Sequence, residues 1–81
     1  MENRRHVRIP VHKVGAISVG PELPKITCSV TDISDGGAAL KVVTTFGIPR
    51  KFELTIEGEP GKRCCNVVWT GAHRLGVAFQ Q

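Results

Sequence analysis

Apolar and polar residues alternate with a period of two along most of the chain. In "KITCSVT", Ile26, Cys28 and Val30 share one side of an extended segment, and the residues between them are polar. The segments "KFELTIE" and "RLGVAF" repeat this alternation, and stretches rich in glycine or proline, such as "GPELP" and "EGEPG", separate the runs. This pattern predicts short β-strands and little or no helix. The expected strands cover residues 12–19, 25–33, 37–43, 51–57, 62–69 and 74–79.

A chain of 81 residues forms one small domain. Six short strands at regular spacing favour an all-β fold, and at this length a closed, antiparallel, six-stranded barrel. Residues 1–10 stand apart because they hold three arginines and end in Pro10. We therefore expect a flexible N-terminal arm over 1–10 and a barrel over 11–81.

The end of the second expected strand contains a conflict. On a straight strand, Asp32 and Ser34 would point inward with Val30, and burying an unpaired carboxylate is costly. A β-bulge between Val30 and Ile33 would remove the conflict. It would send Ile33 into the core and turn Asp32 and Ser34 outward together.

The composition limits the possible functions. The net charge of +4 favours an anionic partner, yet the chain has no tyrosine on which bases could stack, only Trp69 and three phenylalanines (Phe46, Phe52 and Phe79) that mostly stand at positions expected for a core. Three cysteines without a CxxC pair and scattered histidines predict reduced, partly buried thiols and no zinc site.

The sequence also bears on enzymatic activity and location. It offers no nucleophile–base pair and no pair of catalytic carboxylates, so we expect no enzymatic activity. No apolar run is long enough for a membrane span or a secretory signal, and we expect a cytoplasmic protein.

A basic cluster, "RRHVR", occupies residues 4–8. In an extended segment Arg4 and Arg8 project to the same side, about 13 Å apart. The guanidinium fork fits a phosphate or the O6/N7 edge of guanine bidentately. Arg5 faces another direction and receives a lesser role. Taken alone, the cluster is typical of a solvated basic terminus.

An acidic turn, "DISDGG", follows at residues 32–37. The Asp32 carboxylate can accept hydrogen bonds from the N1–H and N2–H₂ donors of guanine. Ser34 can donate to a phosphate oxygen or cap the turn, and Gly37 permits a backbone conformation or a close approach that a side chain would block. Taken alone, this segment is typical of a hairpin turn.

The two clusters together resemble the RxxxR and [D/N]xSxxG motifs of PilZ domains, bacterial receptors for cyclic di-GMP. The resemblance continues through "ITCSVTDISDGGAAL" and "CNVVWTGAHRLGVAF", and so covers nearly the whole chain. It implies a six-stranded barrel with the ligand on its outer face, and an arginine arm that closes over the ligand. The residues that match the family's binding motifs are Arg4, Arg8, Asp32, Ser34 and Gly37.

Further residues receive secondary roles. They are Asn3, Arg5, Gly36, Trp69 and Arg74. The position before RxxxR, here Asn3, influences whether family members bind one or two ligand molecules. Trp69 is a packing residue or a stacking surface, and Arg74 belongs to a solvated turn or lies near the ligand. Gly76 is expected to let another backbone or a large side chain come close.

The resemblance implies a receptor that binds cyclic di-GMP, needs no other cofactor, and signals to a separate partner protein through arm closure. Two alternatives remain at this point. One is a PilZ-like interaction module without ligand binding, and the other is a small basic barrel that binds nucleic acid.

Overall fold

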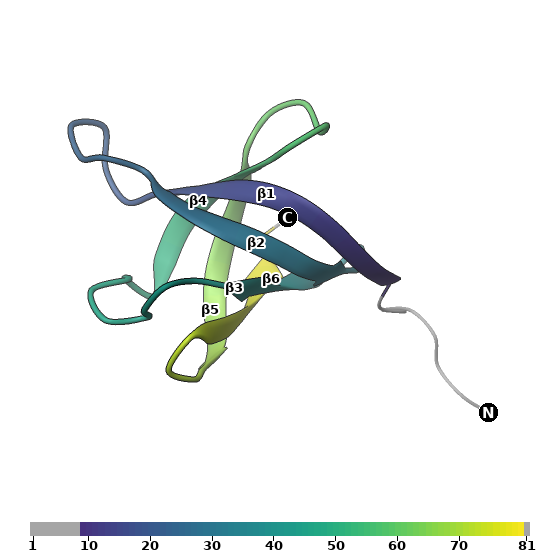
Figure 1. Ribbon diagram of the computed structural model, residues 1–81. Helices are drawn as coiled ribbons and strands as arrows, with labels where there is room; N and C mark the ends of the chain where they lie inside the picture. Colours follow the sequence, from purple (N-terminus) through teal and green to yellow (C-terminus); the bar gives the residue numbers. More distant parts are fainter. Residues whose placement is uncertain (1–8, 81) are drawn as a thin grey trace.

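A computed structural model describes residues 9–80, which form six antiparallel β-strands and contain no helix (Figure 1). The strands are β1 (Ile9–Ser18), β2 (Ile26–Ile33), β3 (Gly37–Lys41), β4 (Lys51–Ile56), β5 (Arg63–Thr70) and β6 (Arg74–Phe79). They close into a barrel in the order β1-β2-β3-β6-β5-β4. The predicted fold class is confirmed, and the predicted strand positions are close to those observed. No membrane-spanning helix occurs between residues 9 and 80.

The start of the barrel differs from the prediction. The sequence predicts an arm over residues 1–10, but Ile9 and Pro10 belong to β1 and pair with Ile33 and Asp32 of β2. Pro10 lies beside an irregularity in the register between Pro10 and Lys13. Proline is tolerated there because it has no N–H to contribute to a regular ladder.

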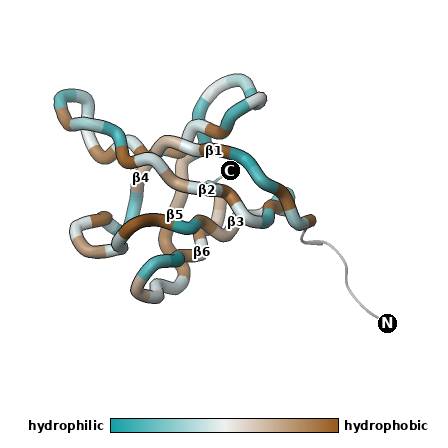
Figure 2. Tube along the Cα trace, in the orientation of Figure 1, coloured by the Kyte–Doolittle hydropathy of each residue, from teal (hydrophilic) through white to brown (hydrophobic). Residues whose placement is uncertain are grey.

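The core consists of the inward-facing residues of all six strands. Members that are fully buried include Ile17, Val30, Leu40, Leu54 and Leu75. Their positions follow the period of two read from the sequence, and hydrophobic and hydrophilic residues alternate along the strands in Figure 2. One phenylalanine departs from this rule. Phe52 and Phe79 are buried as expected, but Phe46 is 91% exposed in the loop after β3.

The predicted β-bulge is present. The pairing of β2 with β3 shifts between Val30 and Asp32, so Thr31 is the extra residue on β2. Beyond the bulge, Ile33 is half-buried and packs against the core. The Asp32 side chain is also half-buried. The bulge therefore lets one strand supply Val30 to the interior and still carry a carboxylate.

The cysteines behave differently from one another. Cys28 and Cys65 are buried, and burial raises the pKa of Cys28 to about 11 and that of Cys65 to about 12. Cys64 is exposed, contrary to our expectation that all three would be partly buried. The prediction failed there because neighbouring residues on a strand point to opposite faces.

This difference predicts how the thiols react. A water-soluble disulfide reagent near pH 8 should modify Cys64 quickly in the folded protein, and Cys28 and Cys65 only after denaturation. Because both buried thiols are held protonated, their contribution to stability is present below pH 9 and is lost as the pH rises toward 11–12. Mass spectrometry of the modified native protein checks the order of reaction. Rapid native labelling of Cys28 would contradict it, and Cys64→Ser is the control that should remove the fast phase.

Candidate functional site

Ser34 closes the turn between β2 and β3. Its backbone N–H donates to the Gly37 carbonyl oxygen at 2.8 Å. Its hydroxyl accepts a hydrogen bond from the Gly36 N–H at 3.2 Å and donates to the Gly37 carbonyl oxygen at 3.4 Å. Since a hydroxyl has one proton, this arrangement uses it within the turn. Of the two roles that the sequence allowed, the structure has Ser34 capping the turn.

The same turn is fixed to the end of β6. The Phe79 N–H donates to the Gly36 carbonyl oxygen at 2.9 Å. A Cβ atom added at Gly37 would overlap the carbonyl oxygen of Val77. Gly37 is therefore required by the close approach of the β6 backbone, which is one of the two reasons expected for it.

Asp32 lies at the β-bulge, between Pro10 of β1 and Ala39 of β3. Ile9, the first residue that the structure describes, is the pairing partner of Ile33. Paired Cα atoms of antiparallel strands are about 4.5–5.5 Å apart. The chain therefore enters the barrel directly beside the acidic turn.

Small residues form a platform on the outer face of β3 and β6, beside Asp32. Gly37 pairs with Ala78, and Ala39 pairs with Gly76. Their neighbours along each strand, Ala38, Leu40, Leu75 and Val77, face the core, so these four lie on the outer face, where Gly37 and Ala78 are half-buried and Ala39 and Gly76 are buried. We call Gly37, Ala39, Gly76 and Ala78 the β3–β6 platform.

Trp69 borders this platform on β5. It pairs with Gly76, and a Cβ atom there would overlap the indole ring. The expectation that Gly76 admits a large side chain is confirmed. The indole remains 43% exposed, so part of its surface is open. Trp69 of β5 pairs with Gly76 of β6, Gly76 pairs with Ala39 of β3, and Ala39 pairs with Asp32 of β2. The backbones at Trp69 and Asp32 are therefore three strand spacings apart, or about 14 Å.

Two cations lie at the other end of the platform from the acidic turn. Arg74 pairs with Lys41 across β6 and β3, and both are exposed. Like charges directly opposite one another are unfavourable unless an anion lies near them. Sequence reasoning named Arg74 but missed Lys41. Its position in the "LKV" alternation indicates an outward-facing residue, but only the strand pairing reveals that its neighbour is also positive.

The other residues of the predicted site are Asn3, Arg4, Arg5 and Arg8, which lie outside the described residues. Between residues 9 and 80, no three histidine, cysteine or acidic side chains gather closely enough to hold a metal ion.

Comparison with known families decides the classification. A family model described as PilZ domain matches residues 2–81, nearly the whole chain. The chain belongs to the PilZ domain family. This is a family of ligand-binding, regulatory domains that includes receptors for cyclic di-GMP. A search of curated proteins found no match.

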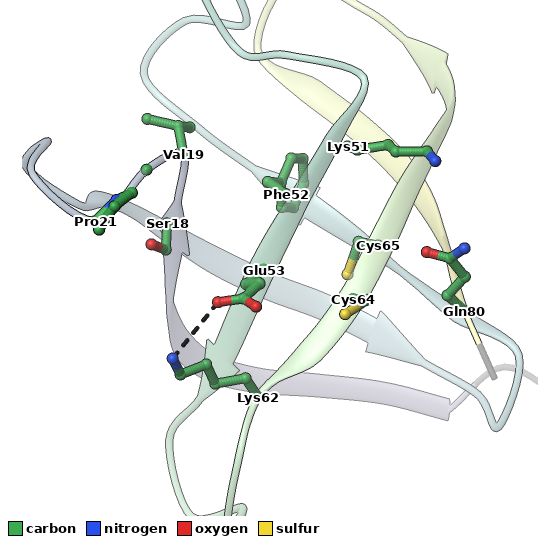
Figure 3. Close-up of a pocket in the computed structure, with 11 residues that line it drawn as sticks. Ser18, Val19, Pro21, Lys51, Phe52, Glu53, Lys62, Cys64, Cys65 and Gln80 are labelled. Carbon is green, nitrogen blue, oxygen red and sulfur yellow. Dashed lines mark ion pairs between the residues drawn. The ribbon is translucent and has the colours of Figure 1, made fainter.

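The PilZ domain also has a separate hollow of about 450 Å³ (Figure 3). It lies over β4, β5 and the end of β1, in a different sector of the barrel from the β3–β6 platform. Lys62 Nζ and Glu53 Oε1 form an ion pair at 3.5 Å at its rim. None of the described residues predicted for the ligand site lines this hollow, so it is not part of that site.

Proposed function

We propose that this PilZ domain binds cyclic di-GMP on the outer face of β2, β3 and β6, with the RxxxR segment closing over the ligand. The pairing of Ile9 with Ile33 carries the proposal, because it joins that segment to the barrel beside the acidic turn. Arg8 is bonded to Ile9, so covalent geometry limits its Cα atom to within about 9 Å of the Ile33 Cα atom. The Arg4 Cα atom lies at most about 14 Å farther along a fully extended chain.

The proposed roles follow from the donors and acceptors that each residue offers. Arg4 and Arg8 bind phosphate oxygens or the O6/N7 edge of guanine through bidentate guanidinium forks. Asp32 accepts hydrogen bonds from guanine N1–H and N2–H₂. Because Ser34 and Gly37 shape the turn and its contact with β6, they act in this proposal by positioning Asp32 and the backbone around it.

The platform gives the ligand a surface on which to lie. Ala39 and Gly76 at its middle are buried, with Trp69 lying over Gly76, so a purine would reach the half-buried Gly37 and Ala78 and stack against the open part of Trp69. Lys41 and Arg74 add positive charge that attracts the two phosphates, with Arg5 and Asn3 in lesser roles. Gly36 contributes its backbone, which ties the turn to Phe79.

In this proposal the protein is a receptor and performs no catalysis. Binding holds the arginine segment against the barrel and changes the surface that a separate protein meets. The signal then passes through that protein.

Isothermal titration calorimetry with cyclic di-GMP tests the proposal. We expect saturable heat with cyclic di-GMP and much weaker binding of GMP and cyclic GMP, because each offers one phosphate and one guanine. Affinity should fall only gently with salt, since few phosphates are contacted, whereas a nucleic-acid polymer would give a steep slope. No saturable heat at high micromolar ligand would refute ligand binding. A steep salt slope with an oligonucleotide, without binding of the dinucleotide, would favour the nucleic-acid alternative.

A further inference from the structure

The loop between β3 and β4, residues 42–50, exposes two apolar side chains. Phe46 is 91% exposed and Val43 is 87% exposed, whereas Ile48 packs against the core. Figure 2 shows hydrophobic residues continuing from β3 into this loop. We call residues 42–50 the Phe46 loop. A surface that covered this ring would remove a large apolar area from water, which is favourable.

The Phe46 loop is held in place by the turn between β5 and β6. The Thr45 hydroxyl donates to the Gly71 carbonyl oxygen at 2.7 Å, and the Thr45 N–H donates to the Ala72 carbonyl oxygen at 3.2 Å. His73 Nδ1 donates to the Val43 carbonyl oxygen at 2.8 Å, and the Val42 N–H donates to the His73 carbonyl oxygen at 2.8 Å. These hydrogen bonds hold the backbone of the loop in place, and with it the apolar residues that the loop carries.

Phe46 occupies the corner of a tight turn within this loop. The Ile48 N–H donates to the Thr45 carbonyl oxygen at 3.2 Å, and Gly47 has φ of 86°. This is the geometry of a type II turn, with Phe46 at its first central position. The ring is therefore presented to solvent by an ordered backbone, so a partner that binds it would not have to order the loop.

The surroundings of the loop are positively charged. Lys41, Arg50, Lys51 and Arg74 flank it in the sequence or in the adjoining turn. None of these four forms an ion pair with another described residue. The sequence has no acidic residue in 36–52 or in 60–81. An apolar centre with a rim of one sign is complementary to an apolar cavity with an acidic rim.

We propose that the Phe46 loop is the docking surface for a partner protein that has an apolar cavity ringed by aspartate or glutamate. Phe46 is the anchor that enters the cavity, Val43 adds apolar contact, and the flanking cations face the acidic rim. Because it rests on exposure, loop geometry and charge, this inference does not require that the barrel bind cyclic di-GMP.

Two other occupants fit the loop less well. A second copy docked through the same face would bring two positive rims together, which is repulsive. A membrane surface would have to accept Thr44 and the exposed peptide groups of the turn along with Phe46, and such groups are costly in hydrocarbon. The observations favour a protein cavity, where polar groups at the rim stay hydrated.

Site-specific photo-crosslinking and reconstitution test the proposal. A photoreactive phenylalanine analogue is placed at position 46 or, as a matched control, at position 23, because Leu23 is also an exposed loop residue at 57%. The protein crosslinked only from position 46 is identified and purified, and its binding to the unmodified PilZ domain is measured by calorimetry.

We expect Phe46→Ser to weaken the affinity of this complex about thirtyfold. Arg50→Glu should weaken it about tenfold, with a smaller effect at high salt, and Leu23→Ser should leave it unchanged.

Other outcomes would overturn the proposal. One is Phe46-dependent sedimentation with phosphatidylglycerol vesicles without a protein complex, and another is a Phe46-dependent self-association. A third is a reconstituted complex insensitive to Phe46→Ser. Titration of Phe46→Ser with cyclic di-GMP keeps the two proposals separate, because this variant should bind the dinucleotide as the unmodified protein does.

Discussion

Replacing Arg8 with alanine is expected to weaken cyclic di-GMP binding about a hundredfold. A bidentate, charge-assisted contact contributes roughly 3 kcal/mol, and each 1.4 kcal/mol changes the dissociation constant tenfold. Calorimetry measures the loss, and thermal unfolding should be nearly unchanged. Arg8→Lys should recover only part of the affinity, since lysine keeps the charge but lacks the planar fork.

Arg5→Ala is the matched control for this experiment. It removes the same charge from the same segment but not one of the two arginines of the RxxxR motif, so we expect only a small loss. Equal losses from Arg5→Ala and Arg8→Ala would show that general positive charge, and not a specific clamp, attracts the ligand. Asp32→Ala should reduce the preference for guanine over adenine dinucleotides, which separates base recognition from phosphate attraction.

Gly37→Ala is expected to destabilise the folded protein by about 2 kcal/mol. The added methyl group would overlap the Val77 carbonyl oxygen, and the two paired strands must separate to admit it. For a domain of this size, the loss corresponds to a fall of roughly 10 °C in the melting temperature. Thermal unfolding followed by circular dichroism measures the effect.

Gly20→Ala is the control for Gly37. A Cβ atom at Gly20 would come no closer than 3.4 Å to Leu23, so this variant should melt within a few degrees of the unmodified protein. A Gly37→Ala protein of normal stability that fails to bind cyclic di-GMP would mean that the glycine serves the ligand directly. The structure favours the other interpretation, in which Gly37 is needed for the close pairing of β3 with β6.

Much of the fold could be predicted because the period of two is clear in β2, β4 and β6. The β-bulge was also predictable, since the cost of burying Asp32 forces a local change of parity after Val30. Phe46 was placed wrongly because the sequence shows how apolar a residue is but not whether a loop folds back over the core. The neighbouring Ile48 does pack against the core, and composition alone does not distinguish the two.

The site was predicted less completely than the fold. The turn residues could be chosen from their chemistry, but that Ser34 caps the turn and Gly37 abuts β6 depends on backbone contacts between distant segments. Lys41 was missed for the same reason, because its pairing with Arg74 joins residues from two separate hairpins. Long-range register is the information that a local pattern does not contain.

The indole that rests on Gly76 has a practical consequence. Trp69 is the only tryptophan, so excitation of the protein in the near ultraviolet yields light from this one location. Its emission therefore monitors the border between the platform and the turn that supports Phe46, without any attached dye. A purine that binds beside the indole and a protein that docks on the adjacent loop would change the Trp69 emission in different ways.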